Sequence, residues 1–356
     1  MTAVSDTAVI SVSRYQNLKF VPTIRDIATK AGVSIKTVSR VLNNEPMVGE
    51  ATYARVTSVM EELGYVPNIL AQQLARGRAN VLGLLCHNAT QAYIHDVLSG
   101  ALESARPRGY GVMTILVDPR QSSAQSELLR MVGQQRVDGY LFTPPCDNMP
   151  ALLEQLNRRA VPFVRLTPHD RTLAFPHVSA TDRQGAQLLT EHLLTLGHRR
   201  IGFVMGNPDH HATHDRLEGY VAALQDRGIS KEDVLICAGD WYFASGVAAG
   251  ERLLALTPPP TAIFASNDEM AAGVLQVAHR QGVKVPDALA VAGFDDVPLA
   301  AQVWPPLTTV RQPIQEIAKL ATALLIDTLE GTPPPVVCFE LPTELVLRES
   351  TCALTM

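Results

Sequence analysis

Two places in the chain bring together side chains that could support catalysis. His210 and His214 lie four residues apart in the segment PDHHATHD, which is the histidine spacing of the zinc motif H-E-x-x-H. His211 occupies the position of the glutamate, so we expect a loop, exposed or lining a pocket, and no metal site. Asp295 and Asp296 could resemble the carboxylate pair of a glycoside hydrolase, but adjacent residues point apart. Because the sequence also lacks a nucleophile elbow, a Walker loop and a G-x-G-x-x-G motif, we expect no catalytic residues and no cofactor.

The composition is that of an ordinary globular protein. The chain has 356 residues, 46% hydrophobic and 18% charged, and this length normally exceeds one hydrophobic core. The five cysteines are scattered without a C-x-x-C pair, which indicates reduced thiols. The N-terminus does not have the pattern of a signal peptide, and no apolar run of about 18 residues occurs. We therefore expect a cytoplasmic protein.

Charge is distributed unevenly along the chain. Residues 1–80 contain nine Lys or Arg and six Asp or Glu, whereas the remainder contains 21 and 29. A basic head on an acidic body suits a head that meets a polyanion.

The N-terminal region has the pattern of three short helices. Thr23 is a good N-cap, and apolar residues then recur at helical spacing until Gly32. A second helix should extend to Leu42, and a third should run from about Glu50 to a stop at Gly64. Three short helices with a glycine in the first turn predict a helix-turn-helix.

The second of these helices is shaped to enter a DNA major groove. Ser34 and Thr37 near its N-terminus can donate to phosphates, and Lys36 and Arg40 can read guanine edges. Ile35 is exposed beside them. The alternative is a small helical cap whose polar residues face water.

The next segment, YVPNILAQQLARGRAN, contains a helix too short to be stable alone in water, so we expect it to fold on contact with a partner. Together with DIATKAGVSIKTVSRVLN, it resembles the lactose-repressor type (LacI/GalR) of bacterial transcription regulators, and the resemblance covers roughly residues 22–350.

The resemblance implies how this protein contacts DNA. Ile35, Lys36 and Arg40 occupy positions of major-groove base readout. Residues 68–76 would form a hinge helix on operator binding, and Leu74 would wedge into a base step of the minor groove. The remaining implied contacts around the hinge and the head are Asn43, Asn68, Ala71 and Gln72. Gly49 and Tyr53 depart from the residues usual at the start of the third helix.

After residue 80 apolar strands alternate with helical segments. The runs VLGLLCHN, GVMTILVD, VDGYLFTPP and VPFVRL lie in a first series, and a second series follows from TDRQGAQLL. This rhythm predicts the α/β class, with two tandem doubly wound parallel-sheet lobes behind the all-α helix-turn-helix head piece. Such lobes resemble periplasmic sugar-binding proteins, which hold ligand in the cleft between them. The family adds three crossing segments, near 178–180, 308–312 and 338–341.

The resemblance also implies which residues bind an effector. Arg216, Asn267 and Asp295 match positions that bind sugar hydroxyls in the family, and Trp241 stands where an aromatic ring often meets a sugar. These groups suit hydroxyls, since a carboxylate accepts, an amide donates and accepts, and arginine donates as a fork. The candidate contacts in the first lobe are His87, Asn88, Tyr93 and Arg165. Asn267 could instead cap the helix that begins at Asp268, and Asp295 could hold a turn.

These observations together predict a homodimeric repressor of carbohydrate uptake or catabolism genes. It would bind a pseudo-palindromic double-stranded operator under the control of a small sugar-like effector. A periplasmic sugar-binding protein is the alternative, but it fits the body alone. The expected divisions are a disordered leader at 1–21, a DNA-binding domain at 22–66, a hinge at 67–79, a first lobe at 80–178 and 312–338, and a second lobe at 179–308 and 341–350.

Overall fold

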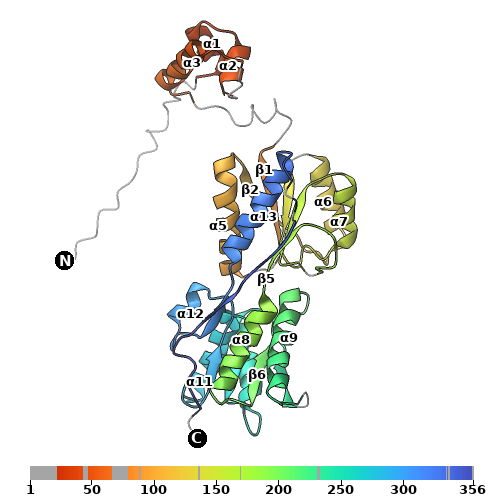
Figure 1. Ribbon diagram of the computed structural model, residues 1–356, viewed down its shortest axis with the longest axis vertical. Coiled ribbons are helices and arrows are strands. Elements are labelled where there is room, and N and C mark those ends of the chain that lie inside the picture. Colours follow the sequence, from red (N-terminus) through yellow and green to blue (C-terminus); the bar gives the residue numbers. More distant parts are fainter. Residues whose placement is uncertain are drawn as a thin grey trace, which may run out of the picture. The chain divides into compact units, whose positions relative to one another are not determined.

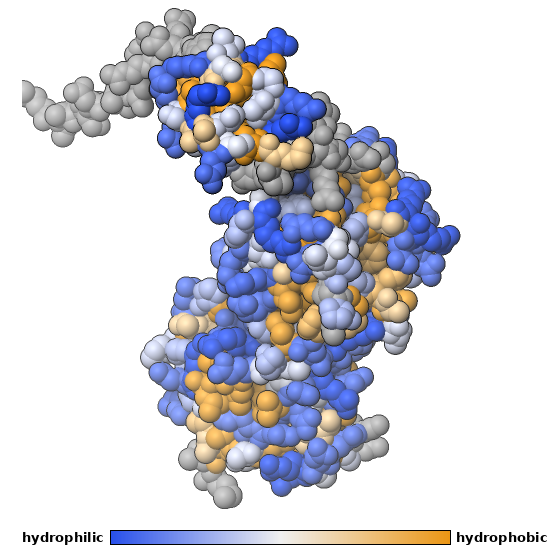
Figure 2. Space-filling model, turned by 45° about the horizontal axis from the view of Figure 1, so that its top comes forward, coloured by the Kyte–Doolittle hydropathy of each residue, from blue (hydrophilic) through white to orange (hydrophobic). Residues whose placement is uncertain are grey.

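The chain folds into two compact units, a head within residues 1–77 and a core within residues 78–356. The computed structural model describes residues 22–42, 47–65, 79–87, 90–134, 137–168, 170–230, 233–333, 335 and 337–354. None of the helices in these ranges has the length and apolarity that a membrane crossing requires. Hydrophilic side chains cover much of the visible face of each unit, and apolar side chains gather in separate patches (Figure 2).

The head contains the three predicted helices, α1 (Ile24–Ala31), α2 (Ile35–Leu42) and α3 (Glu50–Leu63). The Asp26 carboxylate accepts the backbone N–H and the hydroxyl of Thr23, both at 2.7 Å, and so fixes the start of α1. Gly32 and Gly64 end α1 and α3 with φ of 63° and 59°, a left-handed conformation that glycine adopts without strain. The centre of the small core consists of one fully buried residue from each helix, Ile27, Val38 and Val56.

The first lobe of the core is built on a six-stranded sheet in the order β11-β5-β4-β3-β1-β2. All neighbouring strands in it are parallel. Its strands are β1 (Val81–Cys86), β2 (Gly111–Leu116), β3 (Gly139–Phe142), β4 (Phe163–Leu166), β5 (His177–Ala180) and β11 (Cys338–Leu341). Its helices are α5 (Gln91–Ala105), the short 3-10 helix η2 (Arg106–Arg108), α6 (Ala124–Gly133), α7 (Pro150–Arg158) and α13 (Ile314–Leu329).

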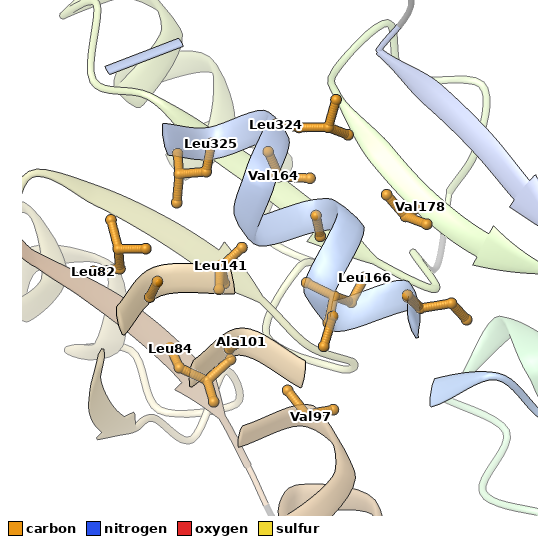
Figure 3. Close-up of a cluster of buried hydrophobic side chains, with 14 of the residues drawn as sticks. Leu82, Leu84, Val97, Ala101, Leu141, Val164, Leu166, Val178, Leu324 and Leu325 are labelled. Carbon is orange, nitrogen blue, oxygen red and sulfur yellow. The ribbon is translucent and has the colours of Figure 1, made fainter. Parts of the chain in front are cut away.

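Helices cover both faces of this sheet, as the doubly wound prediction requires (Figure 1). Helices α5 and α13 lie on one face, where their apolar side chains interdigitate with those of the strands (Figure 3). Helices α6 and α7 lie on the other face. Gly100 of α5 allows the first pair to cross closely, since a Cβ there would lie 2.0 Å from the carbonyl oxygen of Gln315 in α13.

The second lobe repeats this plan around a four-stranded parallel sheet in the order β7-β6-β8-β9. Its strands are β6 (Ile201–Val204), β7 (Leu235–Cys237), β8 (Ala262–Ala265) and β9 (Ala290–Ala292). Helices α8 (Asp182–Thr195) and α9 (His211–Asp226) pack on one face, and α10 (Phe243–Leu254) and α11 (Asp268–Arg280) pack on the other. The short α12 (Pro298–Gln302) packs beside α11.

Three segments connect the lobes within the core. The chain passes from β5 to α8, from β10 (Thr309–Arg311) to α13, and from β11 to β12 (Glu344–Val346), which pairs with β10 in an antiparallel ribbon. Strand β11 pairs with β5 from Cys338↔His177 through Leu341↔Ala180. The expected ends of the two first-lobe segments are residues 178 and 338. Because β5 and β11 pair along their whole lengths, the first sheet extends beyond these residues, to Ala180 and Leu341.

Candidate functional site

The residues predicted to contact DNA from the head lie along α2 and the turn before it. They are Ser34, Ile35, Lys36, Thr37 and Arg40. Ser34, Ile35 and Lys36 are exposed, and the apolar Ile35 side chain is 46% accessible. The hydroxyl of Ser34 accepts the backbone N–H of Thr37 at 3.0 Å, which caps the helix. Five predicted DNA contacts lie outside the described residues: Asn43, Asn68, Ala71, Gln72 and Leu74.

The core contains a pocket between its two lobes. Its volume is about 660 Å³, with the solvent at its mouth included. The first lobe contributes Thr90, Tyr93, Pro144 and Thr167. The second lobe contributes Asp182, His210, Ala212, Arg216, Trp241, Asn267 and Asp295, and the connecting segment contributes Gln312. Four of the predicted effector residues of the second lobe and one of the first therefore face a common space.

Arg216 is the centre of a buried charge cluster in this pocket. Its Nε donates to Oδ1 of Asp182 at 2.8 Å, its Nη2 lies 3.1 Å from Oδ1 of Asp295, and its Nη1 donates to the carbonyl of Ser266. The ring of Phe294 lies against the guanidinium, 3.8 Å from its carbon. Burial opposes the charged form, but the two carboxylates outweigh it and raise the pKa of Arg216. The cluster is therefore one fixed cation held by two carboxylates.

The two neighbouring aspartates, Asp295 and Asp296, point in different directions, as the sequence predicts. Asp295 faces Arg216 in the pocket with 28% of its side chain exposed, and burial raises its pKa to about 7 although Arg216 opposes that shift. Asp296 instead binds Arg311 at 2.8 Å and Arg348 at 2.5 Å. Both aspartates have positive φ, 104° and 59°, so the backbone is strained at these two residues.

Trp241 forms an aromatic wall of the pocket and is held there by its neighbours. The Nδ2 of Asn267 donates to the Trp241 carbonyl at 2.8 Å, while the Oδ1 of Asn267 accepts the N–H of Met270 at 2.9 Å. Asn267 is thus the N-cap of α11 and also lines the pocket. The indole lies over Gly206, where a Cβ would come within 2.2 Å of the ring. The indole Nε1 is buried and has no hydrogen-bond partner among the described residues.

The first-lobe candidates divide between the pocket and the loops around it. Tyr93 lines the pocket and hydrogen-bonds Thr167, and burial raises the pKa of Tyr93. Arg165 is fully buried outside the pocket lining. Its guanidinium donates to the carbonyls of Asp170, Leu173 and Phe175. His87 is also outside the lining, 3.7 Å from Asp118, and Asn88 lies outside the described residues.

Two further pocket residues, Asp182 and Gln312, were missed at the sequence level. Gln312 donates to Oδ1 of Asp182 at 2.6 Å, on the same atom that Arg216 binds. Gln312 is the last residue of one predicted crossing segment, and Asp182 lies two residues after another, and this was the available signal. Asp182 begins α8, and an acid in the first turn of a helix is common without any ligand.

The histidine-rich segment belongs to a helix and its cap. His210 is the N-cap residue of α9 and lines the pocket, 5.8 Å from the Trp241 ring. The prediction of a loop was wrong for His211 and His214, which lie in α9. The first turn of this helix is held by Thr213, whose backbone N–H donates to the carbonyl of His210 and whose hydroxyl donates to the carbonyl of Asn207. No group of three potential metal ligands occurs among the described residues.

Ion pairs join the two lobes beside the pocket. Arg120, after β2, binds Asp209 at 2.6 Å, and Arg171, after β4, binds Asp215 of α9 at 2.8 Å. The first pair is exposed and contributes little, whereas Asp215 is only 11% exposed. The second pair therefore contributes more to the arrangement of the lobes in this structure.

The head and the core both match known proteins. Residues 23–68 match the family described as "Bacterial regulatory proteins, lacI family", and residues 190–351 match "Periplasmic binding protein-like domain". The chain is 33% identical to the HTH-type transcriptional repressor CytR of Escherichia coli (strain K12), over 93% of this chain and 97% of the relative. The chain belongs to the lacI family.

Solved structures of family members agree with this assignment. The transcriptional regulator CelR in complex with cellobiose is 32% identical, with a TM-score of 0.69 over 92% of this chain and 99% of that one. The Lac repressor dimer bound to operator and the anti-inducer ONPF is 29% identical, with a TM-score of 0.81 over 94% and 100%. This lacI-family protein is a helix-turn-helix transcription regulator, and the predicted family and fold class are confirmed.

Proposed function

We propose that this protein represses genes of carbohydrate uptake or catabolism, binding a pseudo-palindromic operator as a homodimer in the cytoplasm. A small sugar-like effector in the interlobe pocket would control that binding. The observation that carries the proposal is the pocket lined by both lobes, in the same chain as a helix-turn-helix head. The protein acts by binding and not as an enzyme, since its charged pocket groups are committed to one another rather than to a nucleophile–base pair.

The effector would contact the pocket residues that the sequence singled out. These are Tyr93, Arg216, Trp241, Asn267 and Asp295. Arg165 and His87 are left out of this set because their side chains serve loops outside the pocket lining. The sugar class is supported by CelR, whose structure contains cellobiose, and by hydroxyl-matching groups in this pocket.

The head would contact DNA through α2 and the residue before it. Lys36 and Arg40 would read base edges, and Ser34 and Thr37 would bind phosphates at the helix N-terminus. The hinge contacts around Leu74 complete the proposed operator site.

Effector and operator would be coupled through the spacing of the lobes. A ligand that touches both walls would change the relative stability of an open and a closed pocket, and interlobe pairs such as Arg171–Asp215, at 2.8 Å in this structure, would be made in only one of these states. The coupling is reciprocal, so the operator must change effector affinity by the same factor.

A comparison of two lysine variants tests the DNA-binding half of the proposal. An operator is first selected from random duplexes with the full-length protein, and affinities for it and for unrelated DNA are then measured at fixed salt. Lys36→Ala should lower the preference for the selected site at least tenfold. Lys30→Ala is the matched control, because Lys30 is on α1 and paired with Glu62 at 2.6 Å, and it should leave the preference unchanged. Equal losses of preference in both variants would contradict the assignment of α2.

A further inference from the structure

Two polar atoms at the pocket are buried and lack hydrogen-bond partners among the described residues. One is Oδ2 of Asp182, whose side chain is 1% exposed, and the other is Nε1 of Trp241. Both residues line the pocket. Buried polar groups are nearly always hydrogen-bonded, so these two atoms indicate a ligand that offers one donor and one acceptor. This inference rests on the proposed function of the pocket.

The charge of the lining decides what kind of ligand can enter. Within the described lining the charged side chains, apart from His210, are two carboxylates and one guanidinium. Each nitrogen of Arg216 already binds a protein oxygen, and the rings of Phe294 and Trp241 lie over the guanidinium at 3.8 and 5.2 Å. A phosphate or carboxylate group would meet Asp182 and Asp295 without a free cation to pair with.

A cationic ligand is also poorly matched. Oδ1 of Asp182 accepts from both Arg216 and Gln312, so this carboxylate is already compensated. Asp295 is held by the same guanidinium, so it also already has a cationic partner. The remaining walls, formed by Trp241, Tyr93 and other uncharged residues, suit a flat and largely apolar face.

We infer that the pocket selects by charge: its effector is an uncharged polyol, a saccharide or a nucleoside, and the corresponding phosphate ester is excluded. One ligand hydroxyl donates to Oδ2 of Asp182 and another to the carboxylate of Asp295, which is 28% exposed. A ligand oxygen accepts the indole N–H of Trp241. Saccharides and nucleosides share this hydroxyl chemistry, and matched probes separate them.

The test compares neutral probes with their own phosphate esters on the full-length protein. The probes are cellobiose, glucose with glucose 6-phosphate, ribose with ribose 5-phosphate, and adenosine with its 5′-monophosphate. Binding is followed by thermal shift and by tryptophan fluorescence in Trp304→Phe, which leaves Trp241 as the single tryptophan. Trp304 is 82% exposed, so this change should not disturb folding. At least one neutral probe should bind, and its phosphate ester should bind at least tenfold more weakly.

Two variants with a matched control connect this preference to the named atoms. Asp182→Asn should lower the affinity for the neutral ligand at least tenfold. It should also reduce the preference of the pocket for the neutral ligand over its phosphate ester, because a carboxylate charge is removed. Trp241→Phe should lower the affinity for the neutral ligand while leaving that preference unchanged. Asp226→Asn makes the same charge change at the far end of α9 and should alter neither quantity.

The possible outcomes separate this inference from the function on which it rests. A phosphate ester that binds as tightly as its neutral parent, or more tightly, overturns the charge rule, even if it also shifts operator affinity and so supports the proposed function. A neutral ligand that binds through Asp182 and Trp241 without changing operator affinity supports the charge rule and overturns the proposed control. Binding by none of the probes overturns both.

Discussion

Removal of the pocket guanidinium should destabilise the core strongly and in a pH-dependent way. In Arg216→Met the aliphatic part of the side chain is kept, while Asp182 and Asp295 lose the cation that they share at 2.8 and 3.1 Å. The Asp182 side chain is 1% exposed, so water cannot replace the guanidinium there. Breaking a buried pair from one side costs about 3–5 kcal/mol, and we expect a loss of this size in the free energy of unfolding at pH 8.

The loss should shrink as the pH falls. Burial already raises the pKa of both carboxyls, with Arg216 opposing the shift, so removal of Arg216 raises both further. A carboxyl whose folded pKa is raised is most favourable to folding at low pH, and that stability is lost as pH rises through the folded pKa. In the wild type this window for Asp295 ends at about 7, and in the variant it extends higher. The deficit should therefore be larger at pH 8 than at pH 5.5.

Urea denaturation at the two pH values measures this difference. The control is Arg280→Met, which breaks an exposed pair with Glu251 at 2.9 Å and should cost no more than about 1 kcal/mol at either pH. Adding Asp182→Asn and Asp295→Asn to Arg216→Met should remove most of the pH-dependent loss. If Arg216→Met costs no more than its control at pH 8, or the same at both pH values, the two carboxylates do not depend on Arg216.

Two further substitutions test the packing around the functional regions. Gly206→Ala would place a Cβ 2.2 Å from the Trp241 indole, and overpacking of this kind costs about 1–3 kcal/mol, so affinity for a neutral polyol should fall in fluorescence titrations. Gly111→Ala is its control, since a Cβ there meets nothing nearer than 3.9 Å, and equal affinities in the two variants would show that the indole is not fixed by Gly206. Val38→Ala removes two methyl groups from the fully buried centre of the head and should cost about 2 kcal/mol there, lowering operator affinity and the hydrogen-exchange protection of α2. Unchanged protection in that variant would contradict the role of Val38 in the head core.

Local sequence patterns were sufficient to predict the three helices of the head and the alternation of strands and helices in the core. Thr23 with Asp26 and the two helix-ending glycines act over three or four residues, so their effect can be read from spacing alone. The helical start of α9 was missed, because the bonds that form it involve Asn207 and the backbone of a turn and not a side-chain periodicity.

The pocket was only partly predictable, and Arg165 illustrates why. It lies near the carboxyl end of strand β4, the edge of the sheet that faces the pocket residues in the prediction, yet its guanidinium turns to three backbone carbonyls of the following loop. Nothing in the sequence distinguishes an arginine that satisfies a loop from one that faces a ligand. Asp182 was overlooked for the converse reason, since an acid at a helix start needs no ligand to explain it.

The sequence by itself determined the two kinds of unit, the caps of the head helices and the parallel, doubly wound class of the lobes, because these depend on residues close together in the chain. Only the tertiary structure decided the charge of the pocket. Arg216 meets Asp182 across 34 residues, and Gln312 reaches the same carboxylate across 130. Whether a buried charge is compensated or open to a ligand depends on such distant partners, and only the folded core brings them together.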